Sequence, residues 1–212
     1  MSDLSDLSNA LTKGDYEVAE SLTKSMLSQG VGADKIINQS IMITLQDVGE
    51  KFSAGEAFIP EMLIAARTAQ KVIEILRPKL EESGVKPLGK VIIGTVQGDL
   101  HDLGKNIVTM MLKGGGFKVQ DLGVDVKPAA FIEAIKTHKP EILALSCLLT
   151  TTMASVPLVI NAIKEAGLRD QVKIMIGGPP TSDAFAQAVG ADFFGKDAHV
   201  AVQLARKIVG VA

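Results

Sequence analysis

Apolar residues in the N-terminal part of the chain recur every three or four positions, which is the period of helices with one buried face. The repeating positions form four groups: Leu4, Leu7 and Leu11; Val18, Leu22 and Met26; Ile36, Ile37, Ile41, Leu45 and Val48; and Met62, Leu63, Ala66, Ala69, Val72, Ile73 and Leu76. Gly14, Gly30, Gly32 and Gly55 lie between these groups, where turns are required. Four helices with short connections predict a small four-helix bundle.

The pattern changes after Glu81–Gly89, a segment rich in glycine, proline and charge that has the composition of a linker. From Lys90 on, short continuous apolar runs alternate with amphipathic helical segments. The expected strands are Lys90–Gly94, Lys118–Leu122, Ile142–Ser146, Lys173–Ile176 and Asp192–Phe194. The expected helices are Leu103–Lys113, Ala129–Thr137, Val156–Glu165, Ser182–Val189 and Ala198–Val209. We therefore expect a helical domain over residues 1–85 and an α/β domain over residues 86–212.

The alternation of strands and helices in the second domain predicts its architecture. Continuous apolar strands are typical of sheets that helices cover on both faces. Five such strands alternating with helices predict a doubly wound parallel α/β sheet of the flavodoxin or Rossmann-like kind, with strand order 2-1-3-4-5. In these sheets the ligand binds at the carboxyl ends of the strands, where the strand order reverses. The loops after the first, third and fourth strands are therefore the expected site.

Composition and charge narrow the class of partner. The net charge of the 212 residues is −2 and no basic cluster is present, which argues against a nucleic-acid partner. The apolar runs are too short to span a bilayer, and the N-terminal MSDLSDLSNA has no export signal, so we expect a cytoplasmic protein without a membrane partner. Cys147 is the single cysteine, which excludes an intrachain disulfide and a cysteine-cluster metal site.

The loop after the first expected strand reads G-D-L-H-D-L-G-K-N, and it carries a candidate metal ligand. His101 stands beyond the strand and before a helix, and a neutral imidazole is a good ligand for a transition metal. Asp99, two residues earlier, can accept a hydrogen bond from the other ring nitrogen and fix the tautomer. Gly104 leaves room for a bulky ligand beside the backbone. Taken alone, this loop favours an ordinary helix-start histidine, with Asp99 as its partner.

The other two loops carry small and hydroxyl-bearing residues. The loop after the third strand reads S-C-L-L-T-T-T-M and contains Ser146, Thr150 and Thr152, which offer hydrogen bonds without filling space or cap a helix. Gly177 and Gly178 follow the fourth strand. One histidine cannot complete a metal site, because a structural metal requires about four ligands. A cobalt corrinoid solves this problem, since its ring supplies four nitrogens and leaves two axial positions.

These three loops together resemble the cobalamin-binding signature. The motif D-x-H-x-x-G is formed by Asp99, His101 and Gly104; S-x-L, starting at Ser146, follows Gly104 after a gap of 41 residues, and G-G follows Leu148 after a gap of 28 residues. The resemblance implies that cobalamin or a related cobamide binds with its own lower base displaced from cobalt, and that His101 is the axial cobalt ligand. The residues implied in cofactor binding are Gly98, Asp99, Leu100, His101, Asp102, Gly104, Ser146, Leu148, Thr150, Thr152, Gly177 and Gly178.

The resemblance also implies a relay from cobalt into the protein. Asp99 would hold His101, and Thr152 matches the serine that continues this relay in the family, with a hydroxyl retained and a methyl added. Ile37–Gln70 is similar to the helical cap of cobalamin-dependent methionine synthase and to corrinoid proteins of methanogens and acetogens, although Asn38 replaces a glutamate of the synthase cap. Phe52 and Ile59 match the residues that shield the upper face of the cofactor, and they are equally compatible with core packing.

The implied function is that of a methyl carrier and not of a complete enzyme. The cofactor would alternate between methylcob(III)alamin and cob(I)alamin, taking a methyl group at a substrate-specific methyltransferase and giving it to an acceptor methyltransferase that uses tetrahydrofolate or coenzyme M. A reductive activase would be a third partner. The methyl donor stays open between methanol, methylamines, aryl methyl ethers and betaine.

Three other functions compete with the methyl carrier. The small cobalamin-binding subunit of an adenosylcobalamin-dependent mutase shares the three loops, but it needs no helical cap of its own. A B12-dependent regulator or light sensor uses a cap with a tryptophan and a Glu-His pair, and this chain has neither. A flavodoxin-like domain without a cofactor leaves the three-loop signature unexplained.

Overall fold

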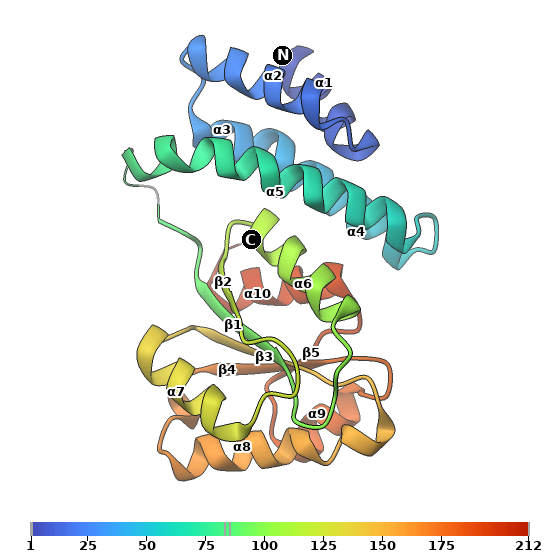
Figure 1. Ribbon diagram of the computed structural model, residues 1–212, viewed down its shortest axis with the longest axis vertical. Helices are drawn as coiled ribbons and strands as arrows, with labels where there is room; N and C mark the ends of the chain where they lie inside the picture. The colour runs from blue at the N-terminus through green and yellow to red at the C-terminus, as the bar shows by residue number, and fades with distance from the viewer. Residues whose placement is uncertain (1, 83, 85, 212) are drawn as a thin grey trace. The chain divides into compact units, whose positions relative to one another are not determined.

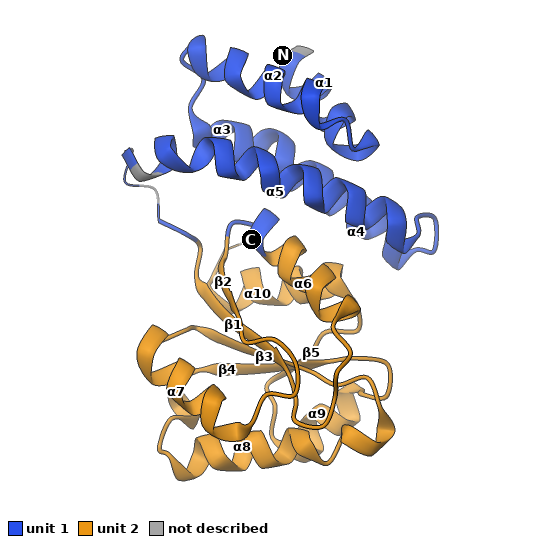
Figure 2. Cartoon of the chain, viewed as in Figure 1, with its two compact units in different colours: residues 1–87, 113–116 blue, residues 88–112, 117–212 orange. Residues whose placement is uncertain are grey.

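The computed structural model describes residues 2–82, 84 and 86–211 (Figure 1). Two compact units divide the chain: residues 1–87 with 113–116, and residues 88–112 with 117–212 (Figure 2). The domain boundary expected from the sequence falls beside Val85, which lies outside the described residues. Within the described part of the chain, none of the helices combines the length and apolar character that crossing a membrane requires.

The first unit is helical. Its elements are α1 (Ser2–Lys13), α2 (Tyr16–Ser28), α3 (Ala33–Ile36), the π-helical turn η1 (Ile37–Ile41), α4 (Met42–Ser53) and α5 (Ile59–Glu82). The long helix α5 packs against α1, α2 and α4. The helical prediction is confirmed with one correction, because the third expected helix is divided into α3, η1 and α4. Its π-helical turn adds a residue to one turn, and the apolar pattern of the sequence does not reveal that insertion.

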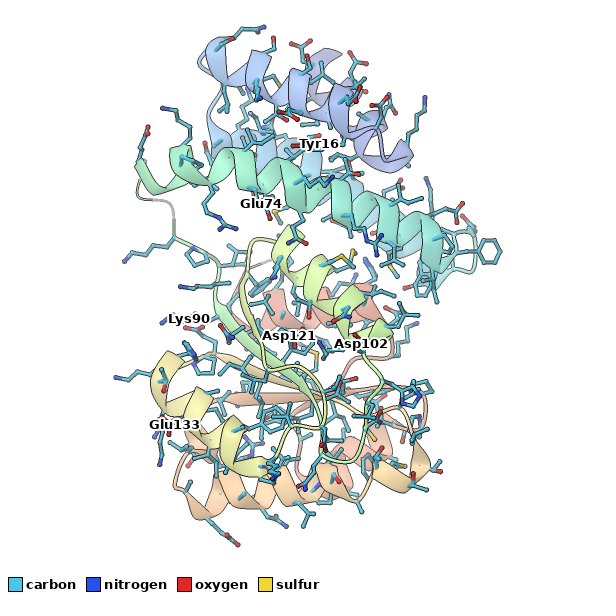
Figure 3. The ribbon with its side chains drawn as sticks, in the orientation of Figure 1. Tyr16, Glu74, Lys90, Asp102, Asp121 and Glu133 are labelled. Carbon is cyan, nitrogen blue, oxygen red and sulfur yellow. The ribbon has the colours of Figure 1, made fainter. Side chains whose placement is uncertain are left out.

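The contacts of α2 illustrate how this unit is joined. Gly14 ends α1 with a φ of 75°, which glycine adopts without the penalty of a side chain. Asp15 then caps α2 by accepting a hydrogen bond from the Val18 backbone N–H at 3.2 Å. Further along, the Lys71 ammonium of α5 lies 4.4 Å from the centroid of the Tyr16 ring of α2. Figure 3 labels Tyr16 on this helix.

The second unit is a five-stranded parallel sheet with strand order β2-β1-β3-β4-β5, as predicted. The strands are β1 (Lys90–Thr95), β2 (Lys118–Asp121), β3 (Ile142–Ser146), β4 (Lys173–Gly177) and β5 (Phe193–Phe194). The helices and helical turns are α6 (Leu103–Gly114), α7 (Pro128–His138), η2 (Thr150–Thr152), α8 (Ser155–Glu165), η3 (Arg169–Gln171), α9 (Asp183–Val189) and α10 (Ala198–Ile208). The register places Ser146 of β3 between Thr95 of β1 and Gly177 of β4.

Alternating side chains of the strands supply two separate cores. On β1, Ile92 contributes to the core shared with α7, α8 and α9, whereas Val91 and Ile93 contribute to the core shared with α6 and α10. Figure 1 shows these helices on opposite faces of the sheet. Both faces of the sheet are therefore covered, which explains why the strands are apolar without interruption. The strand order reverses between β1 and β3, so their carboxyl ends define the crevice.

Candidate functional site

The loop between β1 and α6 presents the candidate metal ligand. The side chain of His101 is 50% exposed, whereas that of Asp99 is completely buried. The His101 Nδ1 lies 2.8 Å from Asp99 Oδ1. An ionised carboxylate can only accept hydrogen bonds, so Nδ1 carries the proton and Nε2 keeps a free lone pair. The pairing therefore selects the tautomer that binds a metal through Nε2.

Asp99 connects the loop after β1 with the loop after β3. Its Oδ1 also accepts the His101 backbone N–H at 3.0 Å, and its Oδ2 accepts the backbone N–H groups of Leu148 at 2.7 Å and Leu149 at 3.4 Å. The Thr152 hydroxyl donates to the same Oδ2 at 2.9 Å. Burial alone would raise the pKa of Asp99, but the hydrogen bonds from Leu148, His101 and Thr152 outweigh it and lower the pKa from 3.8 to about 2. The carboxylate is thus held ionised.

The lowered pKa of Asp99 predicts an acid-sensitive contribution to stability. Because the folded pKa is about 2 and the ordinary value is 3.8, ionised Asp99 stabilises the fold above about pH 4, and this contribution is lost as the pH falls toward 2. We expect the free energy of unfolding of the wild type to fall by about 2 kcal/mol more than that of Asp99→Asn over this range. Urea unfolding at about pH 5 and about pH 2 measures it, and equal losses in both proteins would contradict the prediction.

Thr152 is buried at the end of η2, with its hydroxyl 2.9 Å from Asp99 Oδ2, 3.0 Å from the Leu149 carbonyl and 3.3 Å from the Cys147 sulfur. The structure thus brings together Asp99, His101 and Thr152, as the sequence analysis expected. Thr150, by contrast, is exposed at the start of η2.

Gly177 ends β4 and Gly178 follows it, beside the end of β3. Ser146 and Gly177 are partly buried at the paired ends of these strands. Gly178 has a φ of 124°, and a Cβ atom there would lie 1.8 Å from the Cys147 carbonyl oxygen. The backbone segments at Cys147 and Gly178 are therefore in direct contact, and this contact requires glycine at position 178.

Gly104 lies in the first turn of α6, and a Cβ atom built on it meets nothing within 4 Å. The packing of the chain itself therefore does not require glycine at this position. Its neighbour Asp102 accepts a hydrogen bond from the Asn106 side chain at 2.9 Å, which anchors the start of the helix. The space beside Gly104 is available to a ligand.

Gly104→Ala separates the needs of the fold from those of the ligand. Alanine favours a helix over glycine, so we expect the cofactor-free protein to gain up to about 1 kcal/mol of stability. We expect corrinoid affinity to fall by about tenfold or more, because the added methyl group occupies ligand space. Urea unfolding of the cofactor-free protein and equilibrium titration with corrinoid measure the two effects, and unchanged affinity would show that Gly104 does not face the ligand.

Four exposed leucines, called the leucine rim below, stand in the segment that bears His101 or in the loop after β3, whose backbone binds Asp99. Leu100 is 72% exposed and Leu103 is 58% exposed, and Leu148 and Leu149 are exposed on the facing loop. Large apolar side chains gathered on one exposed edge mark a binding surface. A flat, mainly apolar macrocycle with an axial metal position matches this leucine rim and the single imidazole.

Several residues of the site were not expected from the sequence. The Thr95 hydroxyl donates to the His101 carbonyl at 3.0 Å, and the Ser155 hydroxyl donates to the Gln97 carbonyl at 2.9 Å. Asp125 accepts a hydrogen bond from the Gly98 N–H at 2.7 Å. Asp125 and Ser155 lie 27 and 58 residues from the loop residues that they contact, and Thr95 is the last residue of β1. The sequence marks these residues only as polar residues near the ends of elements.

A buried ion pair anchors the start of α6. The Lys105 ammonium, almost fully buried, donates to the carboxylate of Asp121 at the end of β2 and to the Asn106 side-chain oxygen. Figure 3 labels Asp121 and Asp102, which flank this region. The first turn of α6 is therefore tied to the sheet.

Phe52 and Ile59, expected to shield the cofactor, both belong to the first unit. Phe52 is partly buried in α4, and Ile59 is exposed at the start of α5. Phe58 beside them is 70% exposed. Their role toward the cofactor stays a prediction.

The donor set fits a corrinoid better than a simple metal ion. Among the described residues, no group of three or more histidine, cysteine, aspartate or glutamate side chains gathers to hold a metal. His101 offers an Nε2 that is oriented by the bond from Nδ1 to Asp99, the leucines beside it are exposed, and Gly104 leaves open space in the first turn of α6. A metal that brings four ligands of its own needs one axial nitrogen from the protein, and this site supplies one.

Comparisons with known proteins agree with this chemistry. Two family models, both described as a B12 binding domain, match residues 89–205 and residues 4–77. The chain is 41% identical over 204 residues to the trimethylamine corrinoid protein of Methanosarcina barkeri, which covers 95% of this chain and 94% of that protein.

Two solved structures are also similar over nearly the whole chain. A cobalamin-binding protein from Desulfitobacterium hafniense has a TM-score of 0.82 and 32% identity, over 97% of this chain and 98% of that one. The methanol:cobalamin methyltransferase complex of Methanosarcina barkeri contains a chain with a TM-score of 0.85 and 26% identity, which covers 100% of this chain and 81% of that one.

Proposed function

We propose that this chain, which belongs to the family of B12-binding corrinoid proteins of methyltransferase systems, carries methyl groups that originate from a methylamine. It is the corrinoid carrier of such a system and not a catalyst by itself. The observation that carries the proposal is the half-exposed imidazole of His101, oriented by buried Asp99 at the point where the strand order reverses. The 41% sequence identity to a trimethylamine corrinoid protein, over 95% of this chain, supports a methylamine as the methyl donor.

The residues of the site divide the work of holding the cofactor. When bound, the corrinoid supplies a cobalt atom that accepts a methyl group from one partner and gives it to the next. His101 would hold cobalt through Nε2, and Asp99 would keep the proton on Nδ1. Thr152 would hold Asp99 in place through the hydrogen bond to Oδ2. Because the Leu148 N–H also binds this oxygen, the loop after β3 and the imidazole would move together.

The backbone of the site would admit the rest of the cofactor. Gly98, Leu100 and Asp102 would line it beside the ligand loop, and Gly104 would leave space for the ring. Ser146, Gly177 and Gly178 would line the cofactor at the carboxyl ends of β3 and β4, with Leu148 and Thr150 beside them in the loop after β3. Phe52 and Ile59 of the helical unit would cover the opposite face of the ring. The proposed boundary between the helical domain and the cofactor-binding domain lies between residues 85 and 86.

The proposed partners are three proteins of one methyltransferase system. A substrate-specific methyltransferase would load the methyl group. The methanol:cobalamin methyltransferase complex, which contains a chain similar to this one, supports such a partner. A second methyltransferase would transfer it to tetrahydrofolate or coenzyme M, and a reductive activase would restore oxidised cobalt. Cobalt at low oxidation state requires reducing surroundings, so we place the system in the cytoplasm.

The test is methyl transfer with purified components. The corrinoid-loaded chain would be mixed in turn with a trimethylamine-specific, a dimethylamine-specific and a methanol-specific methyltransferase, each with its own substrate, and the visible spectrum of the cofactor would be followed. Methylation with an amine and not with methanol supports the proposal. Methylation only by a methanol-specific methyltransferase would contradict the assignment of the donor while leaving the carrier function intact.

A further inference from the structure

The chain continues beside β1 after β2 has ended. The Leu122 N–H donates to the Ile93 carbonyl at 2.8 Å, and the Thr95 N–H donates to the Gly123 carbonyl at 3.0 Å. The Val126 N–H then donates to the Thr95 carbonyl at 3.0 Å. These contacts carry residues 122–126 past the end of the sheet and alongside the loop that bears His101.

Asp125 joins this segment to the ligand loop in both directions. Its carboxylate accepts the Gly98 N–H at 2.7 Å, and its own N–H donates to the Asp99 carbonyl at 3.0 Å. The two bonds bracket Gly98 and Asp99, whose side chain orients His101. A bond to a carboxylate is stronger than one between neutral groups, so the shorter contact is also the stronger one.

Asp125 has a left-handed backbone. Its φ is 52°, in a region that few non-glycine residues enter, although aspartate does so more often than most. Glycine would adopt this angle at lower cost, but it would lack the carboxylate that holds Gly98. A residue with an uncommon backbone angle that makes a specific contact beside a functional loop is the kind of observation from which a role can be inferred.

The remaining contacts of the loop leave a gap that Asp125 fills. Ser155 holds the carbonyl of Gln97, and Thr95 holds the carbonyl of His101. Gly98, between them, has a φ of 86° and no side chain with which to fix itself. Without the Asp125 carboxylate, the Gly98 peptide would gain freedom next to the residue that aims the imidazole.

We propose that Asp125 is a positioning residue for His101, acting through Gly98 and Asp99. The proposal rests on the proposed role of His101 as the cobalt ligand. It adds a second carboxylate to the site, one that binds no metal and does not contact the imidazole. Asp125 fixes the backbone of the loop, whereas Asp99 fixes the ring.

Three variants separate the side chain from the backbone angle. Asp125→Gly keeps the left-handed backbone accessible and removes the acceptor for Gly98. Asp125→Asn keeps an oxygen acceptor without the charge, and asparagine tolerates this φ. Lys139→Gly is the matched control, because Lys139 is also left-handed, with a φ of 47°, at the carboxyl end of α7.

Two measurements read the variants. Amide hydrogen exchange of the cofactor-free protein should be about tenfold faster at Gly98 in Asp125→Gly than in the wild type, and intermediate in Asp125→Asn. With cobalt(II) cobalamin bound to protein labelled with 15N-histidine, electron paramagnetic resonance should show the ratio of histidine-bound cobalt (a 15N doublet) to histidine-free cobalt falling about tenfold in Asp125→Gly. Lys139→Gly should match the wild type at Gly98 and at cobalt.

The outcomes distinguish this inference from the proposed function. If the wild type shows the 15N doublet and Asp125→Gly keeps both the wild-type ratio and the wild-type exchange rate, Asp125 is not a positioning residue. If Asp125→Asn exchanges faster at Gly98 than Asp125→Gly does, the acceptor role is wrong. If the wild type itself shows no 15N doublet, the proposed ligand role of His101 fails, whatever the exchange rates are.

Discussion

His101→Ala is expected to leave the chain folded and to remove the protein nitrogen from cobalt. Asp99 loses one donor to its Oδ1 but keeps Leu148, Leu149 and Thr152, so the free energy of unfolding should fall by only about 1 to 2 kcal/mol. With the protein labelled with 15N-histidine, the cobalt(II) spectrum should lose its 15N doublet, which is distinct from the 14N triplet of the cofactor's own lower base, and methyl transfer should slow by about 100-fold.

His138→Ala is the control for this experiment. His138 is exposed at the carboxyl end of α7, away from the ligand loop, and its removal should change neither the spectrum nor the transfer rate. The reading of His101 as ligand would be abandoned if His101→Ala kept the 15N doublet of the wild type.

The second large effect is expected at Gly178. In Gly178→Ala the new Cβ would meet the Cys147 carbonyl oxygen at 1.8 Å, and a φ of 124° is itself unfavourable for alanine. The carbonyl cannot retreat easily, because the Cys147 N–H is bound to the Gly177 carbonyl at 3.0 Å in the strand register. We expect the variant to lose about 4 kcal/mol or more of its free energy of unfolding, or to fail to fold.

Gly167→Ala separates the clash from the backbone angle. Gly167 follows α8 with a φ of 69°, and a Cβ atom there meets nothing within 4 Å. This control should lose about 1 kcal/mol, from the left-handed angle alone. Urea unfolding of both variants measures the difference, and similar losses would mean that the strands can separate to accept a side chain at position 178.

The sequence predicted the sheet well because its signals are local. Continuous apolar runs place β1, β3 and β4 within one residue of their observed ends, and the strand β3 matches at both ends. The parallel order follows from the alternation of strands and helices. The loops that carry Asp99, His101 and Thr152 were predicted for the same reason, since each follows a strand directly.

Other features depend on partners that are distant in sequence. The side chains of Asp125 and Thr95 bind backbone groups of the ligand loop. Every residue has such backbone groups, so no sequence pattern marks these contacts. The Lys105 side chain is buried in its ion pair with the partly exposed Asp121, although both residues have the character of surface charges in the sequence. His199, in the expected helix Ala198–Val209, is buried in the first turn of α10, although histidine is a polar residue.

The buried Lys105–Asp121 pair determines which parts of the site can swivel. It fixes where α6 begins, while Thr95, Ser155 and Asp125 fix the loop before it. The His101 ring is held to this fixed backbone by the hydrogen bond from its Nδ1 to Asp99 Oδ1, and it can turn only when that bond breaks. A side chain that has lost such a bond rotates in picoseconds to nanoseconds, whereas collective motions of helices take microseconds or longer. Release of a metal by His101 would therefore need one broken hydrogen bond and no rearrangement of the helices.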